Sequence, residues 1–111
     1  MTLSQLQALA IEIKQKYNEL NAQDGHKPWT LAEYTQGFVG DVGDLMKLVM
    51  AKNGYRRGQD VDEKLKHELA DCLWSILLIA EVSGIDLEQE FVKNMDQLKL
   101  RIEAQKQNPT L

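Results

Sequence analysis

Two pairs of carboxylates stand out in the sequence, because the spacing within each pair places both acids on one side of a helix. Asp41 and Asp44 are three residues apart, and so are Glu68 and Asp71. Residues with this spacing are neighbours on a helical surface. If the two helices face each other, four carboxylates meet, and such hard oxygen ligands suit Mg²⁺ or Mn²⁺. The four acids are the predicted metal ligands and the candidate catalytic residues.

The acids share the core-facing side of their stretches. The residues predicted on that side are Phe38, Leu45 and Leu48 in the first stretch and Leu65, Cys72 and Ser75 in the second. Carboxylates that converge inside a protein repel one another, and several become protonated unless a cation compensates their charge. Divalent metal binding resolves that conflict. A plainer alternative stays open, in which the acids lie at the edge of two amphipathic helices and are simply solvated.

Hydrophobic residues recur every three or four positions and show no sustained period of two, which predicts an all-α protein. The predicted helices run from about Ser4 to Ala22, from Thr30 to Asn53, from Asp60 to Ser83 and from Asp86 to about Gln105. Capping boxes are predicted at Thr30 with Glu33 and at Asp60 with Glu63. Gly54 and Gly84 are expected to end the second and third helices. The tail from about Gln105, which includes Pro109, is predicted to be frayed.

Four helices of about 30 Å each, joined by short connections, predict one antiparallel four-helix bundle over residues 1–111. The predicted inner stripe of the third helix is Val61, Leu65, Leu69, Leu73, Ile76 and Ala80, and that of the fourth is Leu87, Phe91, Met95, Leu98 and Ile102. The third helix is apolar on more than one face. Such a helix is central or faces a second subunit, so a homodimer or homotetramer is expected.

Composition narrows the function classes. The chain of 111 residues has 43% hydrophobic and 27% charged residues, as an ordinary globular domain does. Its formal charge of −4 argues against a nucleic-acid partner. Cys72 is the only cysteine, which favours a reducing compartment, and it is expected to be a buried, inert thiol. No signal pattern or membrane-spanning run is present, so a cytoplasmic protein with no membrane contact is predicted.

The acid-bearing segments resemble a known family. Gly40-Asp-Val-Gly-Asp-Leu45, followed by Glu68-Leu-Ala-Asp-Cys-Leu-Trp74, is similar to the signature of the MazG-like all-α nucleoside triphosphate pyrophosphohydrolases. The resemblance extends over roughly Lys27 to Arg101. Within the family, the small single-domain branch that includes the dCTP pyrophosphatases is the most similar, since it often has glycine-acid-x-glycine-acid.

The resemblance implies a function. Asp41, Asp44, Glu68 and Asp71 would bind Mg²⁺, with Mn²⁺ as an alternative, and the metal would hold the triphosphate. The reaction would hydrolyse a (deoxy)nucleoside triphosphate to the monophosphate and pyrophosphate, and one carboxylate could orient the attacking water. The chain departs from the family where glutamates are replaced by Asp41 and Asp44. A catalytically degenerate helical oligomer, which binds nucleotide or a protein partner without turnover, is therefore the alternative function.

Four residues are candidates for contacts with the substrate. Trp29 and Trp74 could stack on a base, although each could instead be a packing residue. Lys47 lies one turn beyond Asp44, and Lys93 lies on the fourth helix. Either lysine could meet phosphate oxygens, although an exposed lysine is usually only a solvated charge.

Overall fold

The computed structural model describes residues 1–108 as four α-helices with no strand among them. The helices are α1 (Leu3–Gln23), α2 (Leu31–Lys52), α3 (Val61–Val82) and α4 (Leu87–Gln107). The predicted all-α class and the helix boundaries are confirmed to within two residues. The part of the predicted frayed tail that begins at Pro109 lies outside the described residues. Over the described part of the chain, no helix combines the length and apolarity that crossing a membrane requires.

Local capping explains most of the helix ends. At the start of α2, the backbone N–H of Thr30 donates to Glu33 Oε1 at 3.2 Å, and the Thr30 hydroxyl donates to Glu33 Oε2 at 2.8 Å. At the start of α4, Asp86 Oδ1 accepts a hydrogen bond from the backbone N–H of Gln89 at 3.2 Å. Gly54 and Gly84 follow α2 and α3 with φ of 81° and 68°, which glycine adopts without steric cost.

The predicted capping box at Asp60 and Glu63 is wrong. Asp60 does precede α3, but its backbone is left-handed, with φ of 52°, and its side chain makes no capping hydrogen bond to a described residue. An N-cap side chain reaches the first-turn N–H groups from an extended backbone. The start of α3 is therefore determined by how the α2–α3 connection turns into the helix, and not by a side-chain cap.

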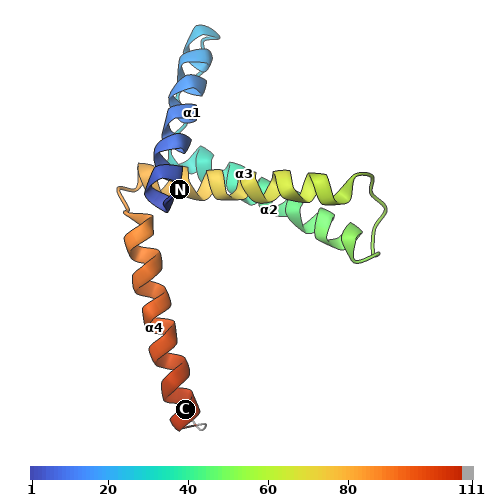
Figure 1. The fold of residues 1–111 in the computed structure, drawn as a ribbon. Helices are drawn as coiled ribbons and strands as arrows, with labels where there is room; N and C mark the ends of the chain where they lie inside the picture. Colours follow the sequence, from blue (N-terminus) through green and yellow to red (C-terminus); the bar gives the residue numbers. More distant parts are fainter. Residues whose placement is uncertain (109–111) are drawn as a thin grey trace.

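The helices form an open arrangement (Figure 1). α2 and α3 lie side by side as an antiparallel hairpin, and most of the contacts between helices are theirs. α1 crosses the C-terminal half of α3, and α4 points away from the hairpin. The expected antiparallel four-helix bundle is therefore not formed within a single chain, because α1 and α4 do not lie along the hairpin.

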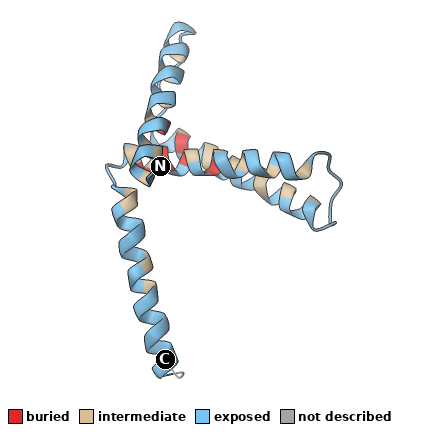
Figure 2. Cartoon of the chain, viewed as in Figure 1, coloured by how far each residue is buried: buried red, intermediate tan, exposed pale blue. Residues whose placement is uncertain are grey.

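The core is small and lies where α1, α2 and α3 meet (Figure 2). Its buried residues are Ala10, Tyr34, Leu77 and Leu78, with Leu3, Leu6, Trp74, Ile79 and Leu87 packed against them. In α4, Leu87–Gln107, no residue is buried. The predicted inner stripes therefore hold only in part. On α3, the side chains of Leu69, Leu73 and Ile76 are exposed, whereas Cys72, Ser75 and Leu78 are buried, because α1 and α2 cover only one of its two apolar faces.

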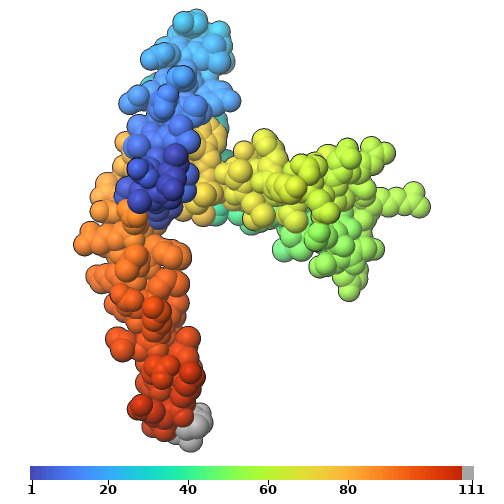
Figure 3. Space-filling model, viewed as in Figure 1, coloured from blue at the N-terminus to red at the C-terminus, as the bar shows by residue number. Residues whose placement is uncertain are grey.

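The chain is extended for its length (Figure 3). Its radius of gyration is 18.2 Å, against about 13 Å for a compact domain of this size. Its accessible surface is 8621 Å², against about 6200 Å² for a compact monomer of 12.7 kDa. Many large apolar side chains contribute to this surface, including Val39, Met46, Leu69, Phe91, Leu100 and Ile102. The chain therefore exposes more apolar surface than a self-contained domain does.

Candidate metal centre

The antiparallel pairing of α2 and α3 brings three of the four predicted acids together. Asp41 and Asp44 on α2 and Glu68 on α3 each offer one carboxylate oxygen, and these oxygens lie within 4.8 Å of one another. The three-residue spacing puts both aspartates on the side of α2 that faces α3. We call these three residues the acidic cluster.

Within the acidic cluster, Glu68 lies in an unfavourable environment for a charged carboxylate. Its Oε2 atom is shielded from solvent and accepts no hydrogen bond from any described residue. Burial raises the pKa of the Glu68 carboxyl, and the negative charges of Asp71, Asp44 and Asp41 raise this pKa further. An unsatisfied carboxylate oxygen among like charges is what a cation would compensate. The donor set of three carboxylates suits Mg²⁺ or Mn²⁺.

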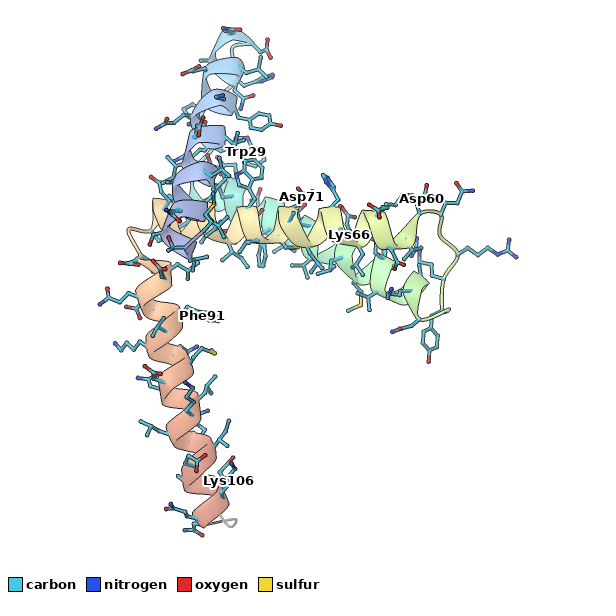
Figure 4. The ribbon with its side chains drawn as sticks, viewed as in Figure 1. Trp29, Asp60, Lys66, Asp71, Phe91 and Lys106 are labelled. Atoms are coloured by element: carbon cyan, nitrogen blue, oxygen red, sulfur yellow. The ribbon has the colours of Figure 1, made fainter. Side chains whose placement is uncertain are left out.

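Asp71 lies on α3 (Figure 4). It is not one of the three acids whose oxygens gather within 4.8 Å of one another. Its negative charge is the largest Coulombic contribution to the raised pKa of Glu68. Its Oδ2 atom lies 3.1 Å from Nε2 of His67, whose side chain is 75% exposed. The structure therefore places the fourth predicted acid beside the other three, paired with an exposed imidazole.

Cys72 lies next to Asp71 in the sequence and is buried, as predicted. Burial raises the pKa of its thiol, and the charges of Asp41 and Glu68 add to this effect. A thiol with a raised pKa stays protonated near neutral pH and is a poor nucleophile.

Two hollows border the acidic cluster. The larger, of about 770 Å³, lies between α1, α2 and α3 and has Asp41 in its wall. The smaller, of about 660 Å³, is lined by Asp44 and Glu68 and also by the cationic or titratable side chains of Lys47, Lys64 and His67. Asp60 and Glu63 also line the smaller hollow, so its wall carries both acidic and basic groups. The three carboxylates therefore lie between a partly open cavity and a shallower hollow of mixed charge.

Aromatic residues form much of the wall of the larger cavity. The rings of Trp29 and Tyr34 meet edge to face, with centroids 5.6 Å apart, and those of Tyr17 and Trp74 are tilted at 5.9 Å. Trp29 is half exposed and lies near the crossing of α1 and α3 (Figure 4). Trp74 packs against the core and donates its indole N–H to the carbonyl of Ala10 at 3.4 Å. Trp74 is thus both a packing residue and part of the cavity wall.

The two lysine candidates have different positions. Lys47 lines the smaller hollow beside Asp44 and Glu68. Lys93 lies on α4 in a shallow depression with Asp86 and Asp96, and it lines neither hollow that borders the acidic cluster. Of these two candidates, Lys47 is the one that borders the acidic cluster within a single chain.

A comparison with protein families shows which family the chain belongs to. The MazG nucleotide pyrophosphohydrolase domain matches residues 29–104, which is more than half of the chain and includes all four predicted acids. The chain belongs to the MazG family. Neither the curated proteins nor the solved structures give a significant match.

The MazG match begins at Trp29, so α1 lies outside it. α1 nevertheless supplies one wall of the larger cavity through Lys14, Tyr17, Asn18 and Asn21. The sequence analysis named none of these residues as a candidate for substrate contact. Lys14, Asn18 and Asn21 recur at intervals of four and three on one side of α1, and this polar stripe was the available signal.

Proposed function

We propose that this MazG domain is a divalent-metal-dependent nucleotide pyrophosphohydrolase. It would hydrolyse the bond between the α and β phosphates of a (deoxy)nucleoside triphosphate, releasing the monophosphate and pyrophosphate. The observation that carries this proposal is the acidic cluster beside an aromatic cavity within a MazG domain. Asp41, Asp44 and Glu68 supply the charge that a divalent cation requires, and the cavity supplies room for a nucleoside.

The acidic cluster would hold the cation. The unsatisfied oxygen of Glu68 fits this role, and Asp71 would be the fourth acid, because its pairing with exposed His67 is weak enough to be exchanged. A bound Mg²⁺ or Mn²⁺ would neutralise phosphate oxygens and lower the pKa of an attacking water. A carboxylate of this set would orient that water as general base.

The larger cavity would take the base and sugar. Its volume falls within the usual range of roughly 300 to 1000 Å³ for small-molecule sites. Trp29, the stacking candidate proposed from the sequence, would offer its half-exposed ring to the base, and Trp74 would contribute a second, anchored ring. The amides of Asn18 and Asn21 each carry donors and an acceptor, which can read the polar edge of a base. Lys47 would meet phosphate oxygens on the far side of the acidic cluster.

For the nucleotide class, we propose deoxynucleoside triphosphates, and dCTP and its relatives first. The support is the glycine-acid-x-glycine-acid pattern at Gly40 to Asp44, which is similar to that of the dCTP pyrophosphatase branch. The predicted cytoplasmic location is part of this proposal, because nucleotide pools are found there.

The test is a pyrophosphate-release assay across canonical and modified nucleoside triphosphates, with Mg²⁺ and with Mn²⁺. We expect release from a subset of nucleotides and a loss of at least about a hundredfold in Glu68→Gln. The matched control is Glu90→Gln, which removes the same charge from an exposed position on α4 and should retain activity. Lack of release from every nucleotide with either metal would contradict the proposal.

We propose that the chain works as a homodimer or homotetramer, in which helices of two chains complete the antiparallel bundle. The excess of exposed surface, roughly 2400 Å² per chain by the scaling of area with mass, is on the scale of obligate homodimer interfaces, about 1000 to 2500 Å² per subunit. α4 contributes to this excess because none of its residues is buried. Lys93 would reach a phosphate only in such an assembly.

A second candidate function is nucleotide binding without turnover. The observation in its favour is that Asp41 and Asp44 replace glutamates that are usual in the family, so each carboxylate is one methylene shorter. Mg²⁺ demands near-ideal octahedral geometry, and a shorter ligand can impair it. Stabilisation of the protein by nucleotide and metal together, with no pyrophosphate released from that nucleotide, would favour this alternative.

A further inference from the structure

Ser75 is the polar residue most closely associated with the acidic cluster that the proposed chemistry does not use. It lies on α3 one turn after Asp71, and only 8% of its surface is exposed. Its hydroxyl donates to Asp41 Oδ2 at 3.1 Å. A serine within a helix often hydrogen-bonds to a carbonyl of its own helix, whereas this hydroxyl reaches across to α2. Its burial on an apolar face is therefore coupled to the position of Asp41.

The hydrogen bond distinguishes Asp41 from the rest of the acidic cluster. Among the described residues, Asp41 is the one member of the cluster whose side chain accepts a hydrogen bond from another side chain. The buried Oε2 of Glu68, by contrast, has no partner there. An ionised carboxylate has about four lone-pair positions, so one bond from Ser75 leaves others for a cation. The bond limits rotation of the short aspartate side chain without consuming its capacity as a ligand.

We propose that Ser75 is a positioning residue, which holds the Asp41 carboxylate in the orientation that presents an oxygen to a divalent cation. This inference rests on the proposed function, because it assumes that the acidic cluster binds metal. Groups that orient metal ligands typically contribute about 10- to 100-fold to metal affinity or activity. The contribution of Ser75 matters more here because an aspartate, rather than a longer glutamate, occupies this position.

The experiment measures Mn²⁺ binding to the full chain by calorimetry, without nucleotide, for wild type, Ser75→Ala and Ser75→Thr. We expect Ser75→Ala to raise the Mn²⁺ dissociation constant about tenfold or more, while Ser75→Thr, which keeps the hydroxyl, restores most of the affinity. In an Asp41→Ala background, Ser75→Ala should have no further effect on the dissociation constant. The matched control is Cys72→Ala, a truncation of a buried neighbour that makes no hydrogen bond to Asp41; its dissociation constant should stay near that of wild type.

The melting temperature without metal separates positioning from folding. If Ser75 has a positioning role, metal should raise the melting temperature of Ser75→Ala less than that of wild type. The metal-free melting temperature of Ser75→Ala should stay near that of Cys72→Ala. Equal Mn²⁺ affinity in wild type and Ser75→Ala would overturn the proposal for Ser75 and leave the proposed function standing. Failure of the wild type itself to bind Mn²⁺ or Mg²⁺ would overturn the metal site, and the role of Ser75 with it.

Discussion

The gathering of three acids between α2 and α3 disfavours the ionised form of Glu68. Its Oε2 atom is shielded from solvent and unpaired among the described residues, and the pKa of its carboxyl is raised, first by burial and then by the neighbouring aspartates. Without a cation, the folded protein therefore holds a proton on Glu68 at pH values where the unfolded chain, with a carboxyl of ordinary pKa near 4.5, has released it. The same residue that prepares the site for metal thus makes the metal-free fold sensitive to pH.

This sensitivity gives a prediction with a definite sign. Between the ordinary pKa of 4.5 and the raised pKa of Glu68, the folded state binds more protons than the unfolded state, so the free energy of unfolding falls as pH rises through that window. We expect the unfolding free energy of wild type minus that of Glu68→Gln to decrease from about pH 4.5 upward and then to level off. Urea unfolding of both proteins across this range measures it.

Bound metal should reverse this loss of stability at higher pH. Above the raised pKa, Mg²⁺ or Mn²⁺ should raise the melting temperature of wild type, because a bound cation stabilises the ionised carboxylates, and should raise that of Glu68→Gln much less. Glu90→Gln, which removes an acid from the exposed surface of α4, should have the pH dependence and the metal response of wild type. A pH dependence that is the same in wild type and Glu68→Gln would contradict the assignment.

At the scale of the elements, Lys14 connects three helices around the larger cavity. Its ammonium on α1 lies 2.9 Å from Glu81 Oε2 on α3, in a pair whose side chains are only 19% and 31% exposed. The same ammonium lies 5.8 Å from the centroid of the Tyr34 ring on α2. These contacts, together with the packing of Leu3, Leu6 and Ala10 in the core, hold the polar stripe of α1 over the cavity.

Loss of this connection should weaken both stability and substrate binding. We expect Lys14→Met to lower the free energy of unfolding by about 1 to 2 kcal/mol, because a partly buried ion pair and a cation–π contact are lost. A double-mutant cycle with Glu81→Gln should give a coupling energy of about 1 kcal/mol. The KM for nucleotide should rise more than kcat falls, because α1 forms a wall of the cavity rather than part of the acidic cluster.

Lys16 provides the matched control, since its ion pair with Glu12 is exposed and lies within α1, with an N–O distance of 3.8 Å. Lys16→Met should change the unfolding free energy by no more than about 0.5 kcal/mol. If Lys14→Met and Lys16→Met have equal effects on stability and KM, the connection does not position α1.

At the scale of the whole molecule, the open shape and the exposed apolar side chains lead to one expectation about assembly. Light scattering coupled to size-exclusion chromatography should give a mass of two or four times 12.7 kDa. The melting temperature should rise with protein concentration, as it does for proteins whose folding and association are linked.

A substitution on α4 tests which surface is involved. Phe91 is 57% exposed and lies on α4, on another helix than Asp71 (Figure 4). Phe91→Glu should reduce the assembly to smaller species, because burying a charge in an apolar interface is costly. Gln97→Glu, at an exposed polar position of the same helix, makes the same charge change and should leave the mass unaltered. A monomeric wild type would contradict the proposed assembly.

Local features explain which helix ends could be predicted. The cap of α2 at Thr30 and that of α4 at Asp86 depend on side chains within one turn of the helix end. The turn at Gly54 depends on the positive φ of one glycine. These interactions span three or four residues, so the sequence contains all of the information. Asp60 is the exception, because its left-handed backbone depends on how the whole connection turns into α3.

The amino-acid sequence alone determined the four helices and, through the three-residue spacing, that Asp41 and Asp44, and likewise Glu68 and Asp71, share a helical side. Only the tertiary structure decided that three of these acids form one cluster, that Ser75 donates a hydrogen bond to Asp41, and that α1 forms a wall of the cavity. It also decided that Leu69, Leu73 and Ile76 face outward. The reason is physical: spacing along one helix follows from its period, whereas packing between helices depends on residues distant in the chain.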